Sequence, residues 1–350
     1  MQFFWQGATV HNESVLMVAR KGELPAARLA FPPTEIVSVM NARLDSTYEA
    51  GVDWTFASGT LRLTAQSRIP VMTEDEMYLP EYVPNVSMPK KGGGAVVFRE
   101  GSFFHDRQIV VTYRHAGKWN GPRPVFADKS LTRTIGKLRK GEPLTMVLYG
   151  DSISEGANAS AFTGVPPFMP IWGQMIVNEL KRHYGSDVVF VNPSVGGTTS
   201  SWGKDNAASL VADERPDLVV IAFGMNDGSG TCNGDGVHPS VYKANIRSIV
   251  DTVRSGNPSA ELILVGTTLP NEETFFLDQQ PYYYEALCEL AAEMPGVAAA
   301  DLTGVHAELL KSKSFSDMTG NNVNHPNDYL SRWYAQFVFC MLAKGGGFTR

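Results

Sequence analysis

The chain has 350 residues, of which 43% are hydrophobic and 19% are charged; this composition is typical of globular proteins, and the length is sufficient for two domains. Its formal net charge is −6 and its lysines and arginines are scattered, so we expect no nucleic-acid partner. Three cysteines without a Cys-x-x-Cys spacing argue against a disulfide framework and against a zinc site.

The N-terminal segment MQFFWQGATVHNESV has no basic region, and polar residues follow a short apolar run. This pattern predicts neither a signal peptide nor a membrane span. We therefore expect a cytoplasmic protein that does not contact a membrane. A secreted or periplasmic protein whose signal peptide has been removed would show the same pattern.

Strand-like runs separated by turn residues fill the first 135 residues. Apolar and polar residues alternate in TLRLTA (60–65) and QIVVTYRH (108–115), which indicates half-buried strands, and Ser58-Gly59 marks a hairpin turn. No window in this part has a long helical period. We therefore predict an antiparallel, jelly-roll-like β-sandwich as an accessory domain over residues 1–135.

Strands and helices alternate from residue 140 onward. The predicted strands are continuous apolar runs: LTMVLYG (144–150), DVVFVN (187–192), DLVVIAFG (217–224), AELILVGT (260–267) and GVAAADL (296–302). Apolar residues at helical spacing lie between them, and the last helix is predicted from Pro326 to about Leu342. Such strands belong to a parallel sheet covered on both faces, so residues 140–350 are predicted to form an α/β domain.

Three of the predicted strands end in glycine and small polar residues. These ends are Gly150-Asp151-Ser152, Gly196-Gly197 and Gly224-Met225-Asn226. Each alone is consistent with an ordinary turn. Ligands of open parallel sheets bind at the carboxyl ends of the strands, so three such ends in succession indicate a functional site.

An attacking serine would explain why these residue types occur together. The attack creates an oxyanion, which donors already aimed at it stabilise. The backbone N–H groups of Ser152, at a helix start, and of Gly197 can supply two donors, and the Asn226 side-chain amide a third. Asp151 and Asp227 are interpreted as structural, as a helix cap and a loop anchor.

A serine nucleophile also needs a base. His325 stands directly before Pro326, and either a base or a capping and packing residue fits this position. His238, in the sequence GDGVHPS, is a rival in the same His-Pro context. His306 falls within a helical pattern and is interpreted as structural.

These blocks, Gly150-Asp151-Ser152, Gly197, Gly224-Met225-Asn226-Asp227 and His325, resemble in order the four blocks of the SGNH (GDSL) hydrolases. The resemblance covers residues 144–342. It implies a flavodoxin-like three-layer α/β/α domain and an esterase or acyl hydrolase without cofactor or metal. Ser152 would be the nucleophile and His325 the general base, and Ser152, Gly197 and Asn226 would form the oxyanion hole. A β-sandwich before such a domain is similar to carbohydrate O-acetyl esterases of this superfamily.

One position departs from the family, which usually has an aspartate three residues before the histidine. This chain has Asn322 there, and an amide can orient the ring but contributes no charge. Three interpretations stay open. The amide or a backbone carbonyl orients His325 in a Ser-His dyad, or Asp317 or Asp328 supplies the carboxylate, or the protein is inactive.

Aromatic residues near the blocks suggest the substrate. Trp202, shortly after the oxyanion glycine, is predicted to contact it, whereas Trp172 and Phe168 fit core packing equally well. No extended apolar lid is evident, which favours short acyl groups.

The resulting prediction is a serine esterase that removes acetyl groups from a carbohydrate through an acyl-enzyme on Ser152. Its partner would be a small-molecule or oligosaccharide ester, and homo-oligomer formation stays open. One alternative is a lipase or thioesterase of the same fold. Another is a catalytically idle carbohydrate-binding protein, which Asn322 favours. A phosphoesterase is a third idea, but this sequence lacks the neighbouring histidine and carboxylate ligands that its two-metal site would require.

Overall fold

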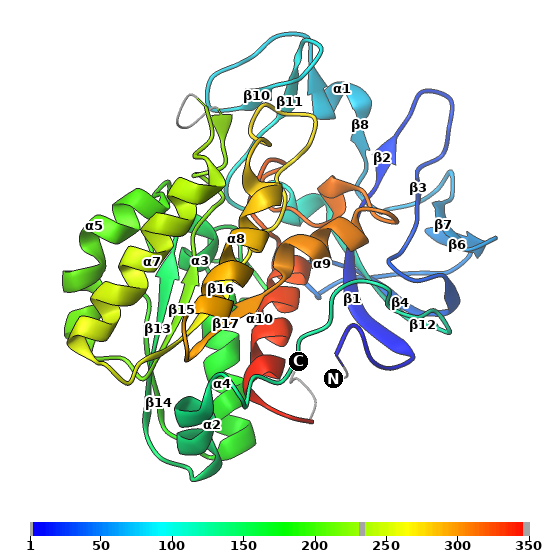
Figure 1. Ribbon diagram of the computed structural model, residues 1–350. Coiled ribbons are helices and arrows are strands. Elements are labelled where there is room, and N and C mark those ends of the chain that lie inside the picture. The colour runs from blue at the N-terminus through cyan, green and yellow to red at the C-terminus, as the bar shows by residue number, and fades with distance from the viewer. Residues whose placement is uncertain (1–2, 231–234, 346–350) are drawn as a thin grey trace.

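The computed structural model describes residues 3–230 and 235–345 (Figure 1). Cys232 and part of the glycine-rich segment around it lie outside the described residues, and Cys288 and Cys340 are free thiols. None of the helices in the described ranges combines the length and the apolar character that crossing a bilayer requires.

Short strands make up the first third of the molecule, here called the β-rich part. Its strands are β1 (Thr9–Leu16), β2 (Val18–Ala19), β3 (Ala26–Ala27), β4 (Pro33–Asn41), β5 (Thr47–Tyr48), β6 (Trp54–Ala57), β7 (Thr60–Leu63), β8 (Met72–Thr73), β9 (Tyr78–Leu79), β10 (Ser87–Pro89), β11 (Ala95–Val97) and β12 (Gln108–His115), with the helical turns α1 (Glu74–Met77) and η1 (His105–Arg107).

Antiparallel pairing dominates this part. The largest sheet has the order β1-β12-β4-β5, and two three-stranded sheets have the orders β3-β7-β6 and β10-β11-β9. Among the described strands of the β-rich part, only β2 and β8 pair in parallel. The predicted hairpin turn is confirmed, because Ser58 and Gly59 connect β6 to β7 and both have positive φ, as a two-residue type I′ turn requires.

A parallel sheet organises the rest of the chain, here called the α/β part. Its strands are β13 (Leu144–Gly150), β14 (Val188–Val191), β15 (Leu218–Ala222), β16 (Glu261–Val265) and β17 (Val297–Ala300), in the order β14-β13-β15-β16-β17. Its helices are α2 (Thr132–Arg139), α3 (Ser152–Glu155), α4 (Trp172–Tyr184), α5 (Ser200–Leu210), α7 (Pro239–Gly256), α8 (Gln280–Glu293), α9 (Leu302–Leu309) and α10 (Asp328–Leu342), with the 3₁₀ turns η2 (Ala212–Glu214) and η3 (Phe315–Asp317). All five predicted strands are confirmed.

Helices cover both faces of this sheet, which gives three layers (Figure 1). Alternate residues of β13 point to opposite faces. Val147 and Tyr149 pack in the cluster that contains α5, α7 and α8, whereas Met146 and Leu148 pack in the cluster that contains α4 and α10. Burial on both faces explains why the strands are continuous apolar runs.

Helix α10 lies between the two parts of the molecule. On one side it packs against α4, and on the other the Arg332 guanidinium donates to the carbonyls of His11 and Asn12 at β1. Almost all of its residues are buried, including the polar Ser331, Arg332 and Gln336, because the helix is covered on both sides. Its N-cap is Asn327, so the helix begins two residues after the predicted Pro326.

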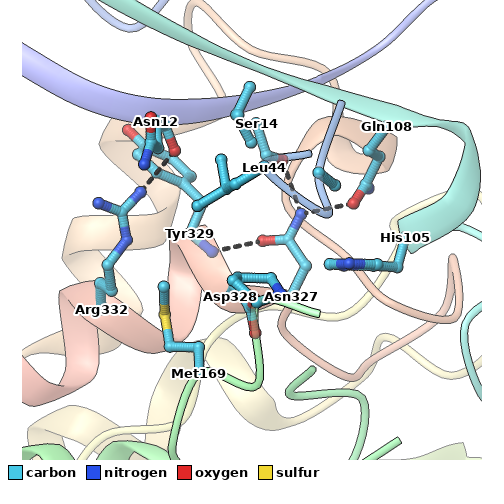
Figure 2. A pocket seen from close by; sticks show the side chains of 13 residues that line it. Asn12, Ser14, Leu44, His105, Gln108, Met169, Asn327, Asp328, Tyr329 and Arg332 are labelled. Atoms are coloured by element: carbon cyan, nitrogen blue, oxygen red, sulfur yellow. Dashed lines mark hydrogen bonds between the residues drawn. The ribbon is translucent and has the colours of Figure 1, made fainter. Parts of the chain in front are cut away.

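Hydrogen bonds from the start of α10 cross the same interface (Figure 2). The Asn327 amide donates to Ser14 Oγ at 2.7 Å and to Gln108 Oε1 at 3.0 Å. The adjoining cavity of about 20 Å³ has room for a single water molecule. Nearby, Lys313 Nζ lies 2.7 Å from Glu13 Oε1, and both side chains are fully buried.

The β-rich and α/β parts also share one hydrophobic cluster, which includes Val15 of β1, Val111 of β12 and Trp333 of α10. Helix α2 crosses the boundary proposed at residues 135–140, and it packs against β13 and α4. The change from antiparallel to parallel pairing therefore occurs between β12 and α2, and a common core joins the two architectures.

Candidate active site

A tight turn at the end of β13 presents Ser152. Asp151 is the N-cap of α3, and its Oδ1 accepts from the N–H of Ile153 at 3.0 Å. A Cβ on Gly150 would lie 2.4 Å from both the Ala222 carbonyl oxygen and Ser154 Oγ, so only glycine fits between the strand and the helix. This turn places Ser152 at the carboxyl edge of the sheet, as the sequence predicts.

His325 lies against this serine. Its Nε2 is 2.8 Å from Ser152 Oγ, a distance at which the ring can accept the hydroxyl proton. The preceding loop is held by Asn321, whose Oδ1 accepts from the backbone N–H groups of Val323, Asn324 and His325. The histidine therefore projects from a loop with a defined shape.

Gly197 and Asn226 line the same cleft as Ser152. Gly197 has a φ of +75°, a backbone conformation that favours glycine. A Cβ on Gly196 would lie 3.0 Å from Glu155 Oε2, which shows how closely this loop approaches α3. The Asn226 amide donates to Thr198 O at 2.9 Å, so the asparagine is fixed beside the glycine loop. The three predicted oxyanion residues are thus brought together.

Two buried aspartates support these loops. Asp227 accepts from the N–H and the hydroxyl of Ser200 and so anchors the start of α5. Burial raises the pKa of Asp227, and burial likewise raises the pKa of Asp151 to about 7. Their contacts are with the backbone and with supporting side chains, consistent with the structural interpretation.

The other ring nitrogen of His325 has two neighbours that the sequence did not indicate. Asn158 Oδ1 lies 2.7 Å and Glu100 Oε2 lies 3.2 Å from Nδ1. Asn158 belongs to the segment after α3, whereas Glu100 follows β11 in the β-rich part. Neither residue has a recognisable spacing from Ser152 or His325, so no sequence signal was available to find them.

Asn322 does not orient His325, and this prediction is wrong. Its side-chain amide donates to the Val97 carbonyl at 3.1 Å, and its backbone carbonyl accepts from the Asn271 amide. The side chain is buried and ties the loop to β11 instead.

The two carboxylates considered in its place also have other partners. Asp317 accepts from the backbone N–H groups of Leu16 and Ser314. Asp328, the first residue of α10, accepts from the N–H of Ser160. Both anchor the ends of segments, and neither is among the described hydrogen-bond partners of the His325 ring.

Trp202 is not among the residues that line the cleft, which corrects the prediction that it contacts substrate. On α5 it faces the core and packs beside Tyr149, with a ring-centroid distance of 6.1 Å. Phe98, Phe162 and Phe276 are the aromatic residues of the cleft.

Two other histidines, His238 and His306, have local roles. His238 caps α7 by accepting from the N–H of Ser240, so it is not a rival base. His306 is buried and accepts from the N–H of Leu269, and burial lowers its pKa to about 3.

The cleft around Ser152 has a volume of about 540 Å³. Its charged lining residues are Glu100 and Glu155, and among the described residues that line it there is no lysine or arginine. Burial would raise the pKa of Glu100. The hydrogen bond and charge of His325, together with the Asn321 and Asn158 amides, outweigh burial and lower this pKa. The cleft is therefore negatively charged at neutral pH.

Known proteins resemble different shares of the chain. Among curated relatives, esterase TesA of Pseudomonas aeruginosa is 32% identical over 126 residues, which are 36% of this chain and 55% of TesA. The arylesterase of Vibrio mimicus is 24% identical over 199 residues, which are 57% of this chain and 88% of that enzyme. The chain thus spans little more than half the length of TesA.

Solved structures that match part of the chain include a two-domain esterase (CEX) active on acetylated mannans, at 19% identity and a TM-score of 0.49, covering 64% of this chain and 54% of that one. Axe2, an acetylxylan esterase from Geobacillus stearothermophilus, has 19% identity and a TM-score of 0.47, covering 58% and 95%. The model of the GDSL-like lipase/acylhydrolase family matches residues 148–332. Because this match takes in more than half of the chain, together with Ser152 and His325, the protein belongs to the GDSL-like lipase/acylhydrolase family.

Proposed function

We propose that this protein is a carboxylic ester hydrolase with Ser152 as nucleophile and His325 as general base. The observation that carries the proposal is the 2.8 Å contact between Ser152 Oγ and His325 Nε2 at the carboxyl edge of the parallel sheet. Membership of an acylhydrolase family and the esterases among its relatives support the same activity.

The reaction follows from this contact. Ser152 Oγ attacks the ester carbonyl carbon while its proton passes to His325 Nε2. The carbonyl oxygen becomes an oxyanion that the N–H groups of Ser152 and Gly197 and the Asn226 amide stabilise. The carbon–oxygen bond to the alcohol then breaks, and that oxygen takes the proton from Nε2. Water, activated by the same nitrogen, hydrolyses the acyl-enzyme and restores the serine.

The lining of the cleft supports an uncharged substrate. Glu100 and Glu155 would repel a phosphate or carboxylate, and the described lining offers no cation to bind one. Phe98 and Phe162 line the cleft, and aromatic rings have apolar faces on which a sugar can pack. We therefore propose a short-chain, acetyl ester of a neutral carbohydrate, bound as a small molecule or oligosaccharide.

Two alternatives make different predictions. A lipase- or thioesterase-type enzyme of the same family would use the apolar lining, which includes Met88 and Phe276, to bind a longer acyl chain. A catalytically idle binding protein is consistent with Asn322, but it does not explain why Asn158 and Glu100 both contact Nδ1 of His325.

The test is hydrolysis of 4-nitrophenyl esters from acetate to palmitate, and of acetylated xylo- and manno-oligosaccharides, with EDTA present. We expect the highest kcat/KM on acetyl esters, and a loss of at least about 1,000-fold in Ser152→Ala and in His325→Ala. A maximum at long chains would favour the lipase alternative. An inert wild-type protein, or a Ser152→Ala variant that keeps full activity, would refute the proposal.

A further inference from the structure

The histidine of a serine hydrolase needs an acceptor on the nitrogen that faces away from the serine. When Nε2 accepts the Ser152 proton, Nδ1 carries its own proton, and the ring becomes a cation as the nucleophile attacks. In this chain the amide of Asn322 is bound to Val97. The acceptor and the compensating negative charge must therefore come from elsewhere.

Asn158 provides the shorter of the two contacts with Nδ1. Its Nδ2 donates to the carbonyls of Gly101 at 3.0 Å and Gly320 at 3.3 Å, so its Oδ1 faces the ring. A Cβ on Gly320 would lie 2.3 Å from Asn158 Cβ, so the close approach depends on that glycine. Asn158 can hold the ring and its tautomer, but it is neutral.

Glu100 provides the charge. Its Oε2 lies 3.2 Å from Nδ1, while its Oε1 accepts from Asn321 Nδ2 at 3.0 Å. Asn321 is fully buried, and its Oδ1 accepts from the backbone N–H of His325. One side-chain amide therefore fixes the positions of both the Glu100 carboxylate and His325. The Glu100 side chain is 49% exposed, so water and salt weaken its field without removing it.

The other charged groups around the ring do not replace it. Glu155 lines the cleft on the side of Gly196, and Asp151 is buried as the cap of α3. Asp328 is held by Ser160. Arg99, next to Glu100 in the chain, has its guanidinium 5.9 Å from the Phe103 ring centroid.

We propose that Glu100, which the β-rich part contributes, stabilises the His325 imidazolium, and that Asn158 fixes the ring, so that two residues divide the work usually done by one aspartate. The inference rests on the proposed esterase function. Glu100 acts through His325 as a positioning and charge-stabilising residue, and it receives no proton. The β-rich part would therefore contribute to catalysis through His325.

The test is the pH profile of kcat/KM on 4-nitrophenyl acetate for the full-length wild type, Glu100→Gln, Glu100→Ala and Asn158→Ala. Removing the carboxylate destabilises the imidazolium, so the acid limb should move down by about one pH unit in both Glu100 variants. The plateau of kcat should fall about tenfold, the equivalent of one pKa unit, while KM stays within about twofold.

Asn158→Ala separates charge from orientation. Because Glu100 is still present, its acid limb should stay near that of the wild type, whereas kcat falls about 100-fold as the ring loses its orientation. Glu81→Gln, which neutralises another exposed carboxylate of the β-rich part, is the matched control and should leave both quantities unchanged. Glu100→Asp should return part of the lost kcat.

The outcomes are distinguishable. If Ser152→Ala is inactive and the acid limbs of both Glu100 variants coincide with that of the wild type, the role of Glu100 is refuted and the esterase stands. If Ser152→Ala keeps wild-type activity, the proposed function itself fails. A shift in Glu81→Gln as large as that in Glu100→Gln would reduce the effect to general surface charge and overturn the inference.

Discussion

The two parts of the molecule contribute to the candidate active site in different ways. The α/β part presents Ser152, Gly197 and Asn226 at consecutive strand ends, where turn geometry sets each position. The β-rich part presents Glu100 from a loop, through packing against a segment more than 200 residues later in the chain. Residues placed by local turns leave a pattern in the sequence. A residue placed by docking of another sheet leaves none.

The largest effect is expected where the two parts are joined. Lys313→Met would leave Glu13 buried without its cation and should lower the free energy of unfolding by about 3–5 kcal/mol, measured by urea denaturation. Lys311→Met is the matched control, because that lysine is 71% exposed, and it should change stability by less than about 0.5 kcal/mol. The shared core leads to a second prediction for wild type. Because the β-rich and α/β parts share one hydrophobic cluster, the protein should unfold in a single transition, and two separated transitions would show that the two parts fold independently.

The contribution of the α/β part is tested at Asn226, one of the proposed oxyanion donors at the sheet edge. Asn226→Ala should lower kcat on 4-nitrophenyl acetate by about 100- to 1,000-fold, because a donor aimed at the oxyanion is lost. Asn206→Ala removes an amide of α5 that bonds only locally, to the Trp202 carbonyl among its described contacts, and should keep wild-type kcat. Equal activity of the Asn226 variant and wild type would remove the side-chain amide from the mechanism.

The α/β part also buries a titratable group that is kept neutral, because burial lowers the pKa of His306 to about 3, whereas the buried Glu13 and Lys313 pair with each other across the two parts. As pH falls, His306 is therefore protonated in the unfolded chain before it is protonated in the folded one. The free energy of unfolding should drop by about 1.4 kcal/mol per pH unit from about pH 6.5 towards 3 on account of this residue. His306→Asn keeps an acceptor for Leu269, so the stability advantage of wild type over this variant should shrink on acidification.

Comparison with that variant is needed because Asp151 acts with the opposite sign. Burial raises its pKa to about 7, so the folded state holds this proton and loses stability as pH rises towards 7. Asp151 is unchanged in His306→Asn, so its contribution cancels in the difference. A wild-type advantage that stays constant between pH 7 and 4 would contradict the assignment to His306.

The smallest effect concerns the aromatic residues of the cleft. Phe162→Ala should raise KM for an acetylated oligosaccharide about fivefold, the equivalent of about 1 kcal/mol of lost ring contact, with little change in kcat. Trp202→Phe should leave KM unchanged, because Trp202 packs beside Tyr149. The reverse result would return Trp202 to the substrate site.

Much of the α/β part could be predicted because its signals are local. Continuous apolar runs identified all five parallel strands, and Gly150 marked a turn in which a Cβ has no room. Because these residues follow strand ends, the sequence also predicted that Gly197 and Asn226 lie near Ser152. The prediction for Trp202 failed because closeness in sequence to Gly197 does not tell which side of α5 faces the core.

The sequence by itself determined the sheet and its carboxyl edge, because strand periodicity and tight turns depend on neighbouring residues, and the pairing of Ser152 with His325 was indicated by the resemblance to the SGNH hydrolases. Only the tertiary structure decided what surrounds Nδ1 of His325. There Asn158 has a left-handed backbone, and Glu100 arrives from the β-rich part, while Asn322 is engaged with Val97. Such contacts depend on the direction of single side chains and on how two sheets far apart in the chain dock, and neither is encoded in local spacing.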